Sequence, residues 1–211
     1  MTGELPPLRN ILEAALLAAG RPLTLDELMA LFDDAQRPAR NQIRKALDEL
    51  QNGFAGRGIE LKEVGGGFRI QVKSELAPWM ARLWEERPAR YSRALLETLS
   101  LIAYRQPITR GEIEAVRGVT VSPHIVRTLE ERGWIRVVGH RDVPGHPEML
   151  ATTREFLDYF NLRSLDELPT LADIRDITSL EAELDFDGTA PVQIAHAEAA
   201  PETPAAETEA E

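Results

Sequence analysis

The chain contains an internal repeat at an offset of 85 residues. Residues 16–32 read LLAAGRPLTLDELMALF, and residues 101–117 read LIAYRQPITRGEIEAVR. Six aligned positions are identical, among them a proline and both ends of a Thr-x-x-Glu pattern, and four more differ only in the branching of an apolar side chain. Because a repeat gives both copies the same architecture, the sequence predicts two similar units in tandem.

The spacing of apolar residues predicts three helices in each copy. A first helix is expected over residues 8–19 and again over residues 92–104. The proline that follows lacks a backbone N–H and cannot continue a helix, so it separates the first helix from the second. A third helix is expected to begin near Pro38 in the first copy and to cover residues 122–132 in the second.

The second helix of each copy begins with a capping box. In this motif a threonine hydroxyl and the carboxylate of a glutamate three residues later each accept a hydrogen bond from the other's backbone N–H. Three such pairs occur: Thr24 and Glu27, Thr109 and Glu112, and Thr152 and Glu155. The third pair predicts an additional helix after the second copy.

A β-hairpin is expected after each third helix. In the first copy its strands are residues 59–64 and 68–72, joined by the glycines at 65–67, which supply the positive φ of a tight turn. In the second copy they are residues 135–141 and 148–152. Three helices followed by a hairpin are typical of a winged helix. The predicted fold is therefore mainly α with small β-hairpins, as two tandem winged-helix domains.

The net charge of −11 is carried by the C-terminal quarter of the chain, since residues 161–211 hold 2 Lys and Arg against 13 Asp and Glu. The last part of this stretch, mostly Ala, Glu, Pro and Thr, cannot bury enough apolar surface to fold. We expect a disordered acidic tail that adds solubility or keeps the chain off nucleic acid. The predicted divisions are an N-terminal domain at 1–86, a linker at 87–91, a C-terminal domain at 92–170 and a tail at 171–211.

Residues 76–84 are expected to form a short helix with an unusually wide apolar face. Either this helix packs back on its own domain, or it forms a protein–protein surface, because aromatic and Met side chains are enriched at the centres of interfaces. The side chains that define this candidate interface are Trp79, Met80, Leu83 and Trp84.

The sequence contains no recognisable catalytic, metal or cofactor motif. It has no cysteine, and the glycines at 65–67 lack the Lys and Ser or Thr of a phosphate loop. His140 and His146 alone are too few for a metal site. We expect a protein that is not an enzyme and holds no cofactor. No apolar run approaches the ~20 residues of a membrane span and the start shows no secretory signal pattern, so a cytoplasmic location is expected.

Winged helices most often bind DNA, which needs positive charge on the third helix. Here the two predicted domains are nearly neutral, with a net charge of −1 over residues 1–88 and +1 over residues 89–160. A free-standing DNA-binding transcription regulator stays open as the alternative to a protein-interaction module.

One long stretch of the second copy resembles a known family. Residues 94–119, ALLETLSLIAYRQPITRGEIEAVRGV, are similar to the signature of segregation and condensation protein B, ScpB. So are the Gly-Pro-rich turn with its two threonines at 139–153 and the sequence SLDELP at 164–169. The resemblance covers roughly residues 8–171, which is nearly all of the chain predicted to fold.

The resemblance implies a function and a set of partners. ScpB proteins are non-enzymatic subunits that dimerise and bind the kleisin ScpA, which bridges the head domains of the Smc ATPase in bacterial chromosome condensation and segregation. The resemblance therefore implies a homodimer. The expected dimer interface is the apolar surface of Trp79, Met80, Leu83 and Trp84. DNA contact is expected to be weak or indirect, and the protein to be cytoplasmic and associated with the nucleoid.

Four residues that match the family signature are not easily explained by folding alone. They are Tyr104, Arg105, Gln106 and Arg117, and we expect them to contact or position the kleisin. Their neighbours have structural explanations, because Thr109 caps a helix and Gly118 is suited to end one in the left-handed conformation.

Overall fold

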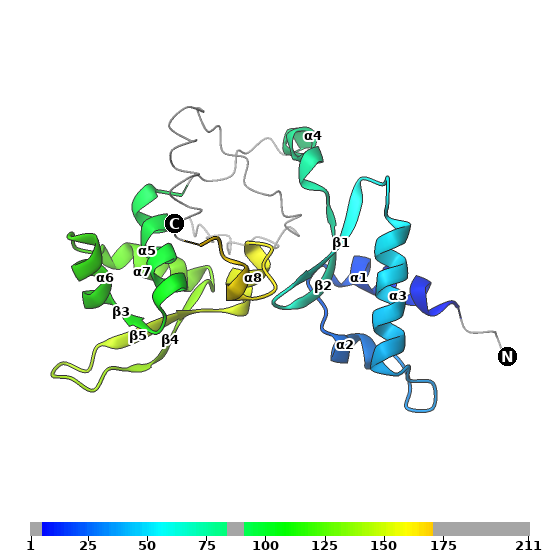
Figure 1. The fold of residues 1–211 in the computed structure, drawn as a ribbon, viewed down its shortest axis with the longest axis horizontal. Coiled ribbons are helices and arrows are strands. Elements are labelled where there is room, and N and C mark those ends of the chain that lie inside the picture. The colour runs from blue at the N-terminus through cyan, green and yellow to red at the C-terminus, as the bar shows by residue number, and fades with distance from the viewer. Residues whose placement is uncertain (1–5, 84–90, 171–211) are drawn as a thin grey trace, which may run out of the picture.

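The computed structural model describes residues 6–83 and 91–170. These residues are mostly helical, with small antiparallel sheets, and they contain two separate hydrophobic cores, one in each half of the chain. The halves are arranged along the longest axis, and the β1–β2 hairpin of the first lies beside α8 of the second (Figure 1).

The first half has three helices followed by a hairpin. Its elements are α1 (Leu8–Ala19), α2 (Leu25–Met29), α3 (Arg40–Gly53), β1 (Ile59–Val64), β2 (Gly67–Val72), the 3₁₀ turn η1 (Ser74–Leu76), α4 (Ala77–Met80) and the 3₁₀ turn η2 (Ala81–Leu83). Apolar side chains at intervals of three and four along α1 and α3 form the core, which includes Leu12, Leu16, Ile43, Leu47 and Leu50. The helix predicted over residues 8–19 is confirmed.

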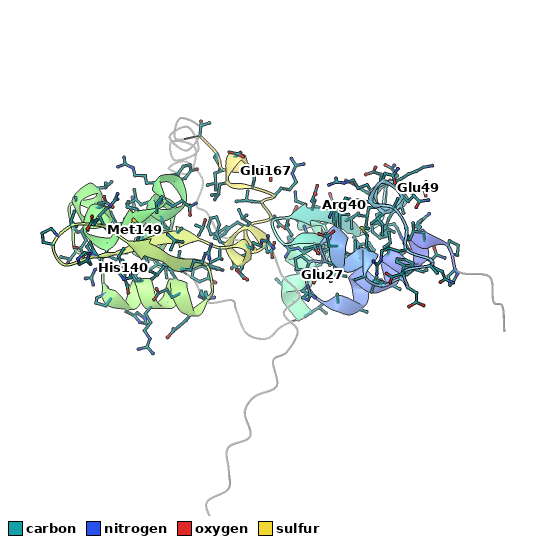
Figure 2. The ribbon with its side chains drawn as sticks, turned by 90° about the horizontal axis from the view of Figure 1, so that it is seen from below. Glu27, Arg40, Glu49, His140, Met149 and Glu167 are labelled. Carbon is teal, nitrogen blue, oxygen red and sulfur yellow. The ribbon has the colours of Figure 1, made fainter. Side chains whose placement is uncertain are left out.

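The second half has the same order of elements. They are α5 (Arg93–Arg105), β3 (Ile108–Thr109), α6 (Arg110–Arg117), α7 (Pro123–Glu131), β4 (Ile135–His140), β5 (Glu148–Thr152), α8 (Arg154–Tyr159) and the 3₁₀ turn η3 (Leu165–Glu167). Its sheet has the order β3-β5-β4, with β5 antiparallel to both neighbours. His140 and Met149 lie on the hairpin that points away from the first half (Figure 2).

The repeat extends to the strand that precedes each second helix. Leu23 bridges Phe68 of β2, and Ile108, which is aligned with Leu23 at the offset of 85, pairs with Leu150 of β5. In the first copy this pairing is a single bridge beside the two-stranded sheet, and in the second copy it is the short third strand β3.

Two of the three predicted capping boxes are confirmed, and one is wrong. Thr24 caps α2 and Thr109 caps α6, each reciprocally with its glutamate. The residue that caps α8 is Thr153, whose hydroxyl accepts from the backbone N–H of Phe156. Thr152 is instead the last residue of β5, because the strand continues to this position before the chain turns into the helix.

The segment predicted as one helix over residues 76–84 is divided into η1, α4 and η2. Pro78 lies in the first turn of α4, where its missing N–H costs no helical hydrogen bond, so it favours a helix that begins here and not one that continues from η1. The α-helical part is the single turn Ala77–Met80. Trp84, the rest of the 84–90 connection and the acidic tail at 171–211 lie outside the described residues.

The Glu27 capping box makes stability depend on pH. The backbone N–H of Thr24 and the guanidinium of Arg21 lower the pKa of Glu27 from 4.5 to about 2. A carboxylate with a depressed folded-state pKa stabilises the protein above its unfolded pKa, and this contribution is lost as pH falls through the folded pKa. We expect Glu27→Gln to be less stable than the unchanged chain at pH 7, with the difference disappearing between about pH 4.5 and pH 2. Urea denaturation of both proteins across this range measures it, and a difference independent of pH would contradict it.

Candidate functional site

The C-terminal end of α5 holds three of the four residues predicted to serve the partner. Gln106 is the C-cap of α5, and its side-chain oxygen accepts from the Thr152 backbone N–H at 2.6 Å and from the Thr152 hydroxyl at 3.0 Å. Its amide nitrogen donates to the carbonyl of Ala103 at 3.3 Å. Gln106 thus ties the end of α5 to β5, which makes it a positioning residue.

Tyr104 and Arg105 lie at the surface beside this cap. The Tyr104 hydroxyl donates to the carbonyl of Pro169 and so fixes the last described residues against α5. Arg105 is exposed and lines an open hollow of about 350 Å³ with Ile108 and Val116 on its apolar side.

The charged side of the same hollow is an ion pair. Arg141 of the second hairpin donates to Glu112 of α6 at 2.6 Å, and both side chains line the hollow. The backbone N–H of Thr109 and then the guanidinium of Arg141 lower the pKa of Glu112, so this carboxylate is ionised at neutral pH. Together with Arg105, the surface presents an apolar floor and fixed charges of both signs, which suits a peptide segment rather than a small substrate.

Arg117 lies away from this hollow. Its side chain is only 11 % exposed and pairs with Glu97 at 3.0 Å, with a further contact to the Thr98 hydroxyl at 3.4 Å. Arg93 and then Arg117 lower the pKa of Glu97. Thr98 precedes Arg105 by seven residues, about 10 Å along a helix. The four predicted residues therefore do not form one patch, and Arg117 joins α6 to the first half of α5.

The predicted interface on α4 and η2 has one buried and one exposed side. Ala77 is buried and Met80 is partly buried, so part of the segment packs back on its own half. Trp79 is 59 % exposed and Leu83 is 69 % exposed, the highest values among the large apolar side chains of the described ranges. Figure 1 shows α4 standing away from the helices of the first half. Trp84 cannot be placed with them because it lies outside the described residues.

The contact between the halves was not predicted from the sequence. The backbone N–H of Gly65 donates to the carbonyl of Leu162 at 2.8 Å, and that of Gly66 donates to the Asp158 carboxylate at 2.6 Å. We call this contact, completed by the Arg69 guanidinium donating to the Asn161 side-chain oxygen at 2.6 Å, the seam. The tip of the first hairpin thus rests on the end of α8 (Figure 1).

Of the three glycines predicted to supply a positive φ, only Gly67 has one, of +126°, whereas Gly65 and Gly66 allow a close approach. A Cβ on Gly65 would lie 2.6 Å from a side-chain carbon of Leu157, and one on Gly66 would lie 2.4 Å from a carboxylate oxygen of Asp158. Burial raises the pKa of Asp158, and the hydrogen bond from Gly66 opposes that rise. Three successive glycines, more than a tight turn requires, were the signal in the sequence for a close approach of this kind.

Four of the basic side chains on and beside the third helices are paired with acidic ones. Salt bridges join Arg37 to Asp34 at 2.8 Å, Lys45 to Glu49 at 4.0 Å and Arg127 to Glu131 at 2.7 Å, and a further one joins Arg40 to Asp26. Such pairing reduces the positive charge that a DNA reader directs at phosphates.

Within residues 6–83 and 91–170, no three His, Asp or Glu side chains are grouped as a metal site would require. None of the helices in these ranges is long and apolar enough to cross a membrane.

Comparison with known proteins finds one family over most of the chain. The model of the family described as "Segregation and condensation complex subunit ScpB" matches residues 10–171. A "Segregation and condensation protein B homolog" of Coxiella burnetii is 54 % identical over 173 residues, which are 82 % of this chain and 83 % of the relative. The "Segregation and condensation protein B" of Syntrophotalea carbinolica is 44 % identical over 182 residues, covering 85 % of this chain and 90 % of the relative.

Solved structures also match. ScpB from Mycobacterium tuberculosis is 36 % identical, with 74 % of this chain and 96 % of that chain covered and a TM-score of 0.34. A structure titled as a dimer of the ScpB N-terminal domain complexed with ScpA peptide is 32 % identical, with 40 % and 100 % covered and a TM-score of 0.34. The sequence matches extend across both halves of the repeat, and on their strength the chain belongs to the ScpB family of segregation and condensation complex subunits.

Proposed function

We propose that this chain is a non-enzymatic subunit of a bacterial Smc–ScpA–ScpB complex and that it binds ScpA. The observation that carries the proposal is the family match over residues 10–171, together with relatives covered over more than four fifths of their length. A related N-terminal domain has been solved as a dimer with an ScpA peptide, which supports both a homodimer and ScpA as the partner. The protein would act in chromosome condensation and segregation, in the cytoplasm at the nucleoid, and reach the Smc heads and DNA through ScpA.

Each half is proposed to be a winged-helix domain, the first within residues 1–86 and the second within residues 92–170. Support comes from the order of three helices and a hairpin in both halves and from the equivalent bridges of Leu23 and Ile108. Such domains would supply surfaces for a partner.

Mixing purified full-length protein with ScpA of the same organism tests the function. A stable complex on gel filtration is expected, and adding Smc should extend it to a three-protein complex. If the proteins elute separately while the chain binds duplex DNA tightly at physiological salt, the transcription-regulator alternative would replace this proposal.

Arg105 is proposed to contact ScpA, with Tyr104 beside it, whereas Gln106 and Arg117 position the helices. We expect Arg105→Ala to weaken ScpA binding by about 30-fold, since an interface arginine commonly contributes ~2 kcal/mol. The variant should melt at the same temperature as the unchanged protein because the side chain is exposed. Calorimetric titration with ScpA measures the affinity.

Arg127→Ala is the matched control for this titration, since Arg127 is an exposed arginine on α7 that is paired with Glu131. It should leave the affinity unchanged. An affinity that is the same for Arg105→Ala, Arg127→Ala and the unchanged protein would show that this end of α5 takes no part in binding ScpA.

A further inference from the structure

An open groove of about 540 Å³ lies between the two halves, next to the seam. On the first half it is lined by α1, β2 and α4, with Leu17, Ile70 and Met80 among the apolar side chains. On the second half it is lined by Trp134 and by Tyr159 of α8. Leu17 is 57 % exposed, although it lies on a helix whose other face forms the core. The groove therefore offers apolar surface that the fold itself does not cover.

The rim of the groove is basic on both walls. Lys73 comes from the end of β2, and Arg132 follows α7. Arg132 is held in place by its hydrogen bond to the Tyr91 hydroxyl at 2.8 Å and by its position 4.7 Å from the centre of the Tyr91 ring. Neither cation forms a salt bridge with a carboxylate in the part of the chain that the structure describes.

The other charges of the groove are largely engaged. Arg21 pairs with Glu27 at 2.8 Å, and Arg69 and Asp158 take part in the seam. Glu155 is the remaining carboxylate of the lining. An occupant that suits the groove thus carries apolar side chains for the floor and negative charge for Lys73 and Arg132.

The chain itself contains a segment of this composition beyond the described residues. Residues 180–187 read LEAELDFD, in which each apolar residue is followed by an acidic one. Over residues 171–211 the chain holds 11 Asp and Glu against a single Arg. The ten residues from Thr170 to Leu180 can span up to about 33–36 Å when extended, and Asn161, nine residues before Thr170, already lines the groove.

We propose that residues 180–187 of the acidic tail dock in the groove of their own chain. Leu180, Leu184 and Phe186 cover the apolar floor, and the intervening carboxylates neutralise Lys73 and Arg132. Tethering favours this occupant, because a short flexible connection gives a segment an effective local concentration in the ~millimolar range. The docked tail connects both halves and excludes other acidic peptides from the groove.

Disulfide trapping in the full-length protein tests the docking, and the absence of native cysteine makes the labelling clean. Ser74→Cys places a thiol on the groove, and Ser179→Cys places one directly before the docking segment. Under mild oxidation in dilute solution we expect an intrachain disulfide, seen as a mobility change on a non-reducing gel and as a linked peptide by mass spectrometry. The control pairs Ser179→Cys with Gln36→Cys, an exposed site in the loop between α2 and α3. This control pair should form its disulfide at least about tenfold more slowly.

Charge variants identify what holds the tail. Lys73→Glu should slow the Ser74–Ser179 cross-link to the rate of the Gln36 control, and Lys45→Glu, on α3, should leave it unchanged. A single variant in which Glu181, Glu183, Asp185 and Asp187 are all replaced by their amides should slow the cross-link as much as Lys73→Glu does. This variant leaves the described residues unaltered. Equal rates at Ser74 and Gln36, or no effect of either charge change, would overturn the proposal. A disulfide formed mainly between two chains would overturn it too, because the occupant would be the tail of a second copy.

Discussion

Replacing Gly67 by alanine is expected to lower the melting temperature of the first half by more than 10 °C. Gly67 has φ of +126°, and a Cβ there would lie 2.2 Å from the carbonyl oxygen of Leu23 and 2.7 Å from the backbone nitrogen of Thr24. These are backbone atoms, held by two hydrogen bonds of 2.8 and 2.9 Å between Leu23 and Phe68, so they cannot move aside without breaking the bridge. Clash and strain together should cost about 3 kcal/mol, and each 1 kcal/mol shifts a domain of this size by about 4–8 °C.

Gly56→Ala is the matched control. Gly56 also has a positive φ, of +73°, but nothing lies within 4 Å of the Cβ it would acquire. It should lose only about 1 kcal/mol from strain. Thermal unfolding followed by circular dichroism measures both variants, and hydrogen exchange in α3 and α7 shows which half is affected. Equal shifts for the two variants would mean that the close approach to Leu23 does not decide the outcome.

Trp79→Glu and Leu83→Glu are each expected to weaken self-association by about 30-fold to 1,000-fold. A truncated hot-spot side chain commonly costs ~2–4 kcal/mol, and a carboxylate buried in an apolar interface adds the cost of its desolvation. Both side chains are exposed on the surface that we propose as the dimer interface, so neither variant should lower the melting temperature of an isolated chain. Analytical ultracentrifugation over a range of concentrations measures the dissociation constant.

Leu31→Glu controls for the dimer experiment, since Leu31 is also a large apolar residue of the first half and is 51 % exposed. It lies just after α2 and is expected to leave the dimer intact. A dimer that survives both Trp79→Glu and Leu83→Glu, or one that Leu31→Glu disrupts equally, would place the interface elsewhere on the first half.

Elements governed by neighbouring residues could be predicted from the sequence. The first helix, the caps at Thr24 and Thr109 and the left-handed C-cap at Gly118 are all set within one helical turn. The cap predicted at Thr152 lies one residue before the observed cap at Thr153, because β5 extends as far as Thr152. That extension depends on strand pairing with a residue far away in the chain.

The roles of the candidate site residues depended on such distant partners. Gln106 and Arg117 looked unexplained because Thr152 lies 46 residues from the first and Glu97 lies 20 residues from the second. The seam joins residues 92 positions apart, as in the contact of Gly66 with Asp158, and no periodicity or spacing encodes such a contact. Arg105 is exposed, and its role in contacting ScpA stays a prediction.

The first hairpin connects the seam to the exposed side chains of α4 and η2. The seam holds it at the Gly65–Gly66 tip, and β2 runs from there to η1 and α4, where Trp79 and Leu83 are exposed (Figure 1). Glu167 of η3 lies close to the place where the two halves meet (Figure 2). Hydrogen bonds from the backbone N–H and the side chain of Arg163 lower the pKa of its carboxylate, and Lys62 of β1 adds a smaller effect. A six-residue strand is about 20 Å long, so a slip of ~1 Å at the tip corresponds to a rotation of roughly 3° between the two cores. A subunit bound at Trp79 and Leu83 would therefore be connected through β2 and the seam to the second half.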